Sequence, residues 1–260
     1  AVLHAYRENQ ASADEGQVVK NAVIAFVLGL GLAGSAAAQH EAALDPANNN
    51  IANTASLQRG AKYFVNYCLG CHSAQYVRYN RVAEDLQISE EQLTNNLMFT
   101  GERPFDTMAN AMRPEDAERW FGITPPDLSL IARSRGNDYI YTFLRSFYAD
   151  PSSPTGVDNV VLPGTAMPHV LWQLQGVQSA VFAPDEHGAE VFERFELARP
   201  GELGVAEFDD VVRDIVNFLD YIGEPIKRER QQLGIRVIGF LLVFLLIAYM
   251  LKKEIWKDVK

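Results

Sequence analysis

Cys68-Leu-Gly-Cys-His72 is the stretch of sequence that decides the fold of this chain. Two thiols three positions apart on one helical turn can reach the two vinyl groups on one side of a porphyrin, while the adjacent histidine turns under the ring to bind iron. Cys68 and Cys71 are the only cysteines in the chain, so no disulfide scaffold or four-cysteine metal site can be built. The pentapeptide predicts one covalently attached haem c.

Other interpretations of the pentapeptide stay open from the residues alone. A thioredoxin-like dithiol normally lies at a strand-to-helix junction within alternating strands and helices, a pattern that the sequence does not show. A zinc site needs a further ligand at matched spacing, and there is no second cysteine pair. A five-residue pattern can also occur by chance. Haem attachment fits best because a helix and an export signal accompany the motif.

Two amphipathic helices are predicted on either side of a long middle segment. Small and apolar residues recur at helical spacing over residues 57–68, with Thr54 or Ser56 available as the N-cap. A second stripe runs over residues 208–222. Each stripe needs a partner, so we expect the two helices to pack together and to cross near Gly60, where a missing side chain permits close approach.

The middle segment is predicted to be mostly irregular, because proline and glycine punctuate it throughout. Short helices are expected at residues 89–99, 114–121 and 138–148. Little of it suggests strand, apart from a short hairpin near residues 157–161. The chain is therefore assigned to the mainly α class.

The N-terminal part has the order of a secretory signal. Lys20 precedes the uncharged segment 21–38, which ends in three alanines, and this predicts cleavage after Ala38. A retained membrane helix is the alternative, although the apolar stretch is short and rich in glycine for a span. Residues 1–38 are assigned to this segment and residues 39–54 to a linker.

The C-terminal part predicts a membrane anchor. Residues 233–251 carry one charge, Arg236, and as a helix they would extend roughly 28 Å, close to the thickness of the hydrocarbon layer. A buried core helix is the alternative, but nothing else in the chain would surround so uniformly apolar a cylinder. We assign residues 55–226 to the haem domain, 227–251 to the anchor and 252–260 to a tail.

The charge distribution bears on possible partners. The net charge is -10, which argues against nucleic acid, because phosphate binding needs a basic surface. Residues 39–226 hold 13 basic and 27 acidic side chains, whereas residues 227–260 hold 8 basic and 3 acidic ones. An acidic body on a basic, apolar stalk suits a basic protein partner.

The second axial ligand of the iron must come from far along the chain. Met167 lies in Leu162-Pro-Gly-Thr-Ala-Met-Pro-His169, where two prolines and a glycine restrict a loop that must hold its sulfur in place. A histidine and a methionine together would leave iron no open position, which favours electron transfer over catalysis. The other candidates are Met98, Met108, Met112, His40, His169 and His187, whereas Met250 is excluded because it lies in the predicted membrane segment.

Residues 55–260 resemble the cytochrome c1 family, the haem-bearing subunits of cytochrome bc1 complexes, in its proteobacterial type. The resemblance rests on the order of five features. They are Cys-Leu-Gly-Cys-His-Ser at 68–73, Thr-Pro-Pro-Asp-Leu-Ser at 124–129, Ile-Ala-Arg-Ser-Arg-Gly-Asn-Asp-Tyr-Ile at 131–140, Pro-Gly-Thr-Ala-Met-Pro at 163–168 and the anchor.

The resemblance implies a class I c-type cytochrome domain with long irregular insertions and a single C-terminal transmembrane helix. It also implies a role for each matching residue. Cys68 and Cys71 would form the thioethers, His72 and Met167 would be the axial ligands, Arg135 would pair with a haem propionate, and Tyr139 and Pro126 would line the pocket. With two cysteines no disulfide can hold the methionine loop, so packing and prolines must.

By the same resemblance, the chain would be an electron-carrier subunit of quinol:cytochrome c oxidoreductase and not an enzyme on its own. It would pair with cytochrome b, take one electron from a Rieske iron-sulfur protein and pass it to a soluble or membrane-bound cytochrome c. The haem domain would lie in the periplasm and the C-terminus in the cytoplasm, with the inner membrane crossed once. A different anchored monohaem cytochrome, such as an oxidase subunit or a shuttle, and a haem enzyme or sensor are the alternatives.

Acidic clusters late in the haem domain would steer a basic acceptor, or would simply keep the domain soluble. They are Asp185-Glu186, Glu190, Glu193, Glu196, Glu207, Asp209 and Asp210.

Overall fold

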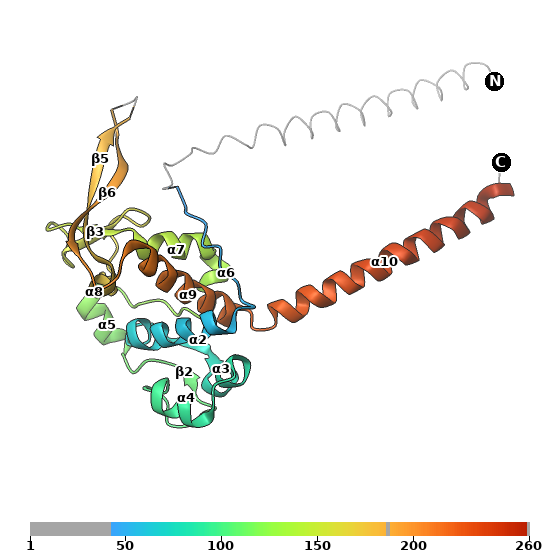
Figure 1. Cartoon of the computed structure of the whole chain (residues 1–260), viewed down its shortest axis with the longest axis horizontal. Coiled ribbons are helices and arrows are strands. Elements are labelled where there is room, and N and C mark those ends of the chain that lie inside the picture. Colours follow the sequence, from blue (N-terminus) through green and yellow to red (C-terminus); the bar gives the residue numbers. More distant parts are fainter. Residues whose placement is uncertain (1–42, 186–187, 259–260) are drawn as a thin grey trace, which may run out of the picture. The chain divides into compact units, whose positions relative to one another are not determined.

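The computed structural model describes residues 43–185 and 188–258 of the chain (Figure 1). The predicted signal segment with its cleavage after Ala38, and the ligand candidates His40 and His187, lie outside these residues. About half of the described chain is helical, in line with the mainly α prediction. The described strands form three separate two-stranded sheets.

The helix before the motif changes its winding as it reaches the first cysteine. The α-helix α2 (Thr54–Tyr63) continues directly into a π-helical turn, η1 (Phe64–Cys68), in which the Leu69 amide donates to the Phe64 carbonyl at 2.9 Å. Such turns are rare and occur often at functional sites. The predicted N-caps are wrong, because Asn53 caps the helix by accepting from the Ser56 amide.

The predicted crossing of the two long amphipathic helices is confirmed. Helix α9 (Val205–Gly223) packs on α2, and a Cβ built on Gly60 would lie 2.1 Å from the Asp214 carbonyl oxygen and 2.7 Å from the Phe218 Cβ. No side chain fits there without moving the α9 backbone. The rings of Phe64 and Phe218 lie 5.4 Å apart beside this contact. Glycine at position 60 is therefore what allows α2 to deliver Cys68 close against α9.

A buried carboxylate fastens the same crossing. Asp214 accepts hydrogen bonds from Ser56 Oγ at 2.6 Å and from Arg59 Nε at 2.5 Å. The Asn217 amide group, one turn further along α9, donates to Ser56 Oγ at 2.9 Å and to the Asn50 carbonyl at 2.9 Å. Since each of these buried polar groups has a partner, the crossing fixes α2 in register on α9.

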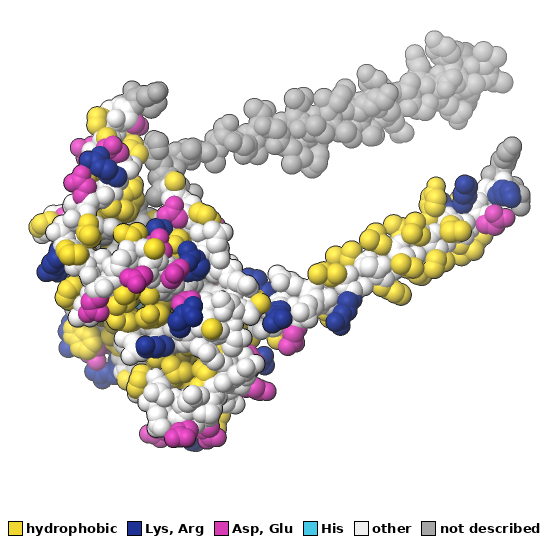
Figure 2. Space-filling view, viewed as in Figure 1, with side chains coloured by type: hydrophobic (Ala, Val, Ile, Leu, Met, Phe, Trp, Pro, Cys, Tyr) yellow, Lys and Arg dark blue, Asp and Glu magenta, His cyan; other side chains and the backbone are white. Residues whose placement is uncertain are grey.

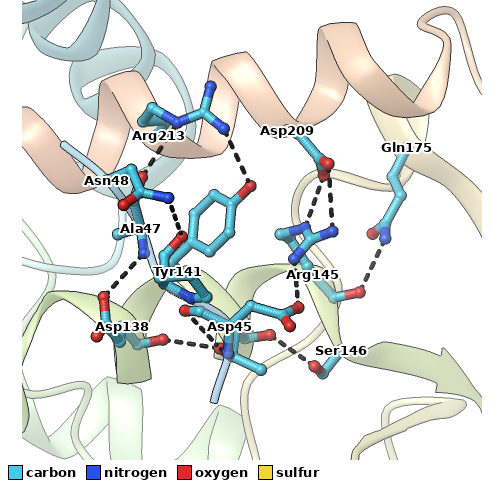
Figure 3. Close-up of polar contacts among 12 residues, drawn as sticks. Asp45, Ala47, Asn48, Asp138, Tyr141, Arg145, Ser146, Gln175, Asp209 and Arg213 are labelled. Carbon is cyan, nitrogen blue, oxygen red and sulfur yellow. Dashed lines mark hydrogen bonds and ion pairs between the residues drawn. The ribbon is translucent and has the colours of Figure 1, made fainter.

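Two further helices, α6 (Ile131–Arg135) and α7 (Asn137–Arg145), pack against α9. Residues 45–48, which the sequence assigns to a linker, lie along α7 and α9 (Figure 3). The Ala47 amide donates to Asp138, and Arg145 bridges Asp45 and Asp209, each at 2.6 Å. These contacts tie the start of the described chain to both helices.

The shorter helices follow local signals in the sequence. Ser89 and Gln92 form a capping box at the start of α4, and Pro114 occupies the first turn of α5. The helix predicted at 114–121 is confirmed, and the one predicted at 89–99 is present but shorter. The bounds of the four helices are α3 (Tyr79–Leu86), α4 (Glu90–Asn96), α5 (Pro114–Phe121) and α8 (Trp172–Gln175).

The strands form three antiparallel pairs. They are β1 (Ala74–Arg78) with β2 (Thr107–Met108), β3 (Phe147–Ala149) with β4 (Val157–Asn159), and β5 (Gly176–Pro184) with β6 (Glu190–Pro200). The prediction of a helix over 138–148 is wrong at its end, because residues 147–149 form β3. A strand does lie at residues 157–159, and its partner is β3.

The β5–β6 hairpin is a feature that the sequence analysis missed. Its two strands pair from Gly176↔Pro200 to Pro184↔Glu190, and the hairpin projects from the body of the domain (Figure 1). At its base Gln178 donates to the carbonyls of Arg145 and Phe147, each at 2.8 Å. Its outer part is half-buried to exposed and holds no fully buried residue, so its sequence lacks the alternation of apolar and polar residues that marks a strand with one buried face.

The last helix has the length and composition to cross a membrane. Helix α10 (Lys227–Ile255) is followed by a 3-10 turn, η2 (Trp256–Asp258), and none of the described side chains on α10 is buried. Hydrophobic side chains cover it between basic residues at its two ends (Figure 2). Its first turn is tied to α9, because Lys227 Nζ lies 2.8 Å from the Asp220 carboxylate.

Candidate haem-binding site

The residues of the pentapeptide lie together at the end of η1. Cys68 is the last residue of the π-helical turn and is buried, whereas Cys71 and His72 are half-buried. The amides of Cys71 and His72 both donate to the Cys68 carbonyl, at 3.1 and 2.8 Å. The chain therefore reverses tightly here, and both thiols and the imidazole are held within one compact turn.

A backbone carbonyl fixes the orientation of the His72 ring. Its Nδ1 lies 2.8 Å from the Pro126 carbonyl oxygen, which can only accept a hydrogen bond. Nδ1 must therefore carry the proton, and Nε2 keeps its lone pair. A hydrogen bond from the ring nitrogen that does not face the metal is the usual way in which proteins select the tautomer and direction of a metal-binding histidine. The predicted pocket residue Pro126 is thus brought to His72 through its backbone.

Burial sets the protonation of the three groups. It raises the pKa of the Cys68 thiol to about 12 and raises the pKa of the Cys71 thiol as well. Burial also lowers the pKa of His72, with the Pro126 carbonyl opposing the shift. His72 is therefore neutral at physiological pH, which is the form that can bind a metal ion.

Two other segments hold the turn in place. The Asn110 side chain donates to the Cys71 carbonyl at 2.6 Å, and the Asn110 amide donates to Ser73 Oγ at 3.0 Å. On the other side, the Leu128 amide donates to the Ser73 carbonyl at 2.8 Å. Sequence analysis missed Asn110, and no local signal could have found it, since its role depends on the β1–β2 pairing that brings Met108 beside Ala74.

Arg135 is the last residue of α6 and Tyr139 lies in the first turn of α7, and their side chains approach each other. The Arg135 guanidinium lies 5.4 Å from the centre of the Tyr139 ring, and it is exposed. From Tyr139 a row of rings leads on through Phe143 and Phe147 to His169, with successive centres 6.2, 5.1 and 5.1 Å apart. The row connects the predicted propionate partner to the end of the loop that carries Met167.

Met167 lies on the loop between β4 and α8, half-buried against the hydrophobic core. Its amide donates to the buried Thr165 Oγ1 at 3.4 Å. Gly164 adopts a φ of +74°, a left-handed conformation that glycine reaches without strain, directly after Pro163. The predicted restriction of this loop by Pro163 and Gly164 is consistent with its backbone.

The other candidate ligands occupy different environments. Met98 and Met108 are buried among core side chains, Met112 is half-buried, and Met250 is exposed on α10. His169 is buried with its ring stacked on Phe147, 5.1 Å between centres.

The donor set suits haem c. It comprises two thiols on one turn and a neutral imidazole whose Nε2 is free of the tautomer-fixing bond. No group of three or more His, Cys, Asp or Glu side chains arranged to hold a metal ion occurs in residues 43–185 and 188–258. The zinc interpretation of the pentapeptide therefore finds no further ligands in the described chain.

Comparison with known proteins gives one consistent family. The model of the cytochrome C1 family matches residues 49–178 and 204–259, a match that leaves out most of the β5–β6 hairpin. The chain is 50% identical to a cytochrome c1 of Allochromatium vinosum, over 83% of this chain and 89% of that protein. It is 45% identical to a protein of Nitrosomonas europaea named ammonia monooxygenase gamma subunit, over 84% and 90% of the two chains. Identity to a cytochrome c1 of Rhodospirillum rubrum is 28%, over 78% and 82%.

Proposed function

The chain belongs to the cytochrome c1 family, and on this premise we propose that it is the electron-transfer subunit of a quinol:cytochrome c oxidoreductase. In this role it takes one electron from a Rieske iron-sulfur protein and passes it to a soluble or membrane-bound cytochrome c. The observation that carries the proposal is the His72 ring, neutral and held by the Pro126 carbonyl so that Nε2 can bind iron. When bound, haem c supplies a one-electron couple at its iron.

The residues of this chain divide the work of holding the cofactor. Cys68 and Cys71 would hold haem c covalently through their thiols, and His72 and Met167 would bind its iron. Arg135, exposed and held over Tyr139, pairs with a propionate. A class I cytochrome fold for the haem domain accords with the pairing of α2 and α9 across the core.

Membrane attachment follows from α10, with the haem domain in the periplasm and the C-terminus in the cytoplasm. Export supports this orientation, because c-type haem is attached outside the bacterial inner membrane. Lys252, Lys253 and Lys257 then lie on the cytoplasmic side, as the positive-inside rule favours. Cytochrome b is the proposed partner of α10, and one relative of this chain is named cytochrome b/c1.

The relative named as a subunit of ammonia monooxygenase does not supply a second candidate function. The proposal rests on the Cys68–His72 segment of this chain and on its match to the family model, both of which point to an electron carrier. The alternative is a different anchored monohaem cytochrome, which would not purify together with cytochrome b and a Rieske protein.

The test is purification of the native complex from membranes in mild detergent. Cytochrome b and a Rieske protein are expected to accompany this chain in fixed proportion. Added quinol is expected to sharpen and strengthen the visible absorption band of its haem as the haem is reduced. Reduction should stop when the Rieske protein is extracted and should return when it is added back. A chain that purifies alone, or whose reduction by quinol does not need the Rieske protein, would refute the proposal.

The acidic clusters divide into two kinds. Asp209 is committed to Arg145 and ties α9 to α7, whereas Asp210 is paired with Arg213 within α9 and stays exposed. Glu190, Glu193 and Glu196 are exposed on β6, where Arg194 pairs with the last two. The hairpin therefore presents three exposed acidic side chains, Glu190, Glu193 and Glu196, to a basic acceptor.

We predict that the rate of reduction of a basic cytochrome c falls about tenfold or more from low to high ionic strength, because salt screens steering between exposed charges. A triple variant, Glu190→Gln with Glu193→Gln and Glu196→Gln, should be slower at low salt and flatter in its salt response. Stopped-flow mixing measures both. The matched control changes two exposed glutamates of α4, Glu90→Gln and Glu91→Gln, and should keep the parent's rate. A parent rate that does not depend on salt contradicts steering.

A further inference from the structure

The loop that carries Met167 starts and ends on the same small hairpin. It leaves β4 after Asn159 and runs to His169, just before α8. The β3–β4 hairpin pairs Phe147 with Asn159 and Tyr148 with Asp158. Three of these four residues make side-chain contacts with the loop: Asn159 and Asp158 with its first part and Phe147 with its end.

Asn159 holds the start of the loop. It is fully buried, at 0% exposure, and its Oδ1 accepts hydrogen bonds from the amides of Val161 at 2.9 Å and Leu162 at 3.2 Å. Its Nδ2 donates to the Phe143 carbonyl, at the C-terminal end of α7, at 2.8 Å. One buried amide group thus joins the loop to the helix, and its own donor and acceptor atoms are both satisfied by these bonds.

Asp158 holds the turn that precedes the methionine. Its Oδ1 accepts from the Gly164 amide at 2.7 Å, and its Oδ2 accepts from the Tyr148 hydroxyl at 3.3 Å. Gly164 is the residue in left-handed conformation, so this bond fixes the point where the loop changes direction.

Phe147 holds the other end of the loop. Its ring stacks on that of His169, two residues after Met167, with an angle of 5° between the planes. Phe147 is almost completely buried, so the stack has little freedom to move. Both ends of the methionine segment are therefore attached to a single rigid unit.

We propose that the β3–β4 hairpin is the positioning device for the axial methionine, with Asn159 as its principal residue and Asp158 and Phe147 in support. This inference rests on the proposed function, because it takes Met167 as an iron ligand. Both cysteines of the chain lie in the haem motif, so no disulfide can restrain the methionine loop. The hairpin restrains it by hydrogen bonds and ring stacking. When a ligand residue is already held in its binding position, less conformational entropy is lost as the iron–sulfur bond forms, and the bond is more stable.

The test compares two buried asparagines in the haem-loaded protein. Asn159→Ala is expected to abolish or strongly weaken the far-red absorption band that reports iron-methionine bonding in the oxidised state, and to lower the midpoint potential. The fraction of protein that binds carbon monoxide should rise about tenfold, the shift expected when buried hydrogen bonds that favour one of two states are lost. Asn217→Ala is the matched control. Asn217 is as deeply buried as Asn159 and also donates to a backbone carbonyl, that of Asn50, but it lies on α9, away from the methionine loop.

Asn217→Ala should lower the melting temperature by a similar amount and leave the band, the potential and carbon monoxide binding as in the parent. Asp158→Ala, at a half-buried position, should fold and show a smaller loss of the band. If Asn159→Ala and Asp158→Ala lose thermal stability but keep the band and the potential, the hairpin is merely structural and the proposal is overturned. Should Asn159→Ala fail to accumulate, an unchanged band in Asp158→Ala overturns it equally.

Met167→Leu distinguishes the proposed positioning role of the hairpin from the proposed role of Met167 as an iron ligand. If Met167→Leu keeps the parent's band and potential, the ligand assignment fails and the positioning role fails with it. If Met167→Leu loses both while the Asn159 and Asp158 variants keep them, the hairpin proposal alone is wrong.

Discussion

Replacement of both cysteines, Cys68→Ser with Cys71→Ser, is expected to give a protein that acid acetone strips of all pigment. Serine cannot form a thioether, so any haem that remains would be held only by His72, by Met167 and by packing. Denaturation in acid removes those three kinds of contact together. In the parent protein the pigment should stay with the precipitated chain, and the measurement is the absorbance of pellet and solvent after extraction.

The control for this variant must destabilise the same turn without touching a thiol. Leu69, between the two cysteines, is 1% exposed, and Leu69→Ala should cost about 2–5 kcal/mol of stability through the cavity that it leaves. Its pigment should nevertheless remain in the pellet. If the parent protein turns colourless on extraction, or if the double variant keeps its colour, haem is not attached covalently through Cys68 and Cys71.

The parts of the fold that the sequence predicts well are those governed by local periodicity. The two apolar stripes require partners, and Gly60 in the first stripe lets α9 approach closely, so their crossing follows from the pattern. The proline at the start of α5 is a similar local signal, and the predicted bounds of that helix match.

The parts that the sequence does not predict depend on residues far apart in the chain. The β5–β6 hairpin has no fully buried residue in its outer half, so no alternation of apolar and polar residues marks its strands. Residues 147–149 continue an apolar helical pattern, and only pairing with β4 turns them into a strand. Local preference in both places is overridden by tertiary contacts.

The candidate site shows the same division. The residues that bind the haem covalently lie in one pentapeptide, since in this motif the two thiols that bind one porphyrin are three positions apart. Its supports, however, are amide and carbonyl groups whose sequence neighbours reveal nothing. Asn110 reaches Cys71 across β1–β2, and Pro126 reaches His72 through a backbone oxygen that any residue would supply. Only the structure identifies such groups.

The acidic clusters illustrate how the structure refines a charge pattern. Counted along the sequence, Asp209 and Glu193 are equivalent negative charges near a predicted acceptor surface. In the fold, Arg145 holds Asp209 against the residue 45–48 segment, with a distance of 2.6 Å, whereas Glu193 faces solvent on the hairpin (Figure 3). The family model does not match residues 179–203, so the match leaves out most of this hairpin.

Met167→Leu is expected to lower the midpoint potential of the haem-loaded protein by on the order of 0.1 V or more, since axial ligands set haem potentials over about 0.8 V. The thioether sulfur favours the reduced state of iron, and leucine offers no donor in its place. Leucine has nearly the volume of methionine, so the loop should keep its packing at a cost below about 1.5 kcal/mol. The potential is measured by redox titration followed in the visible spectrum, which should also shift toward the high-spin form.

Met98→Leu makes the same chemical change at a buried core position and should leave the potential as it is in the parent. The pair therefore separates the loss of an iron ligand from the loss of a methionine. If Met167→Leu titrates like the parent protein, Met167 is not a ligand and the sixth position must be filled by another side chain. His169 would then be tested next with His169→Leu, because it lies on the same loop and is the described histidine nearest to Met167 in sequence.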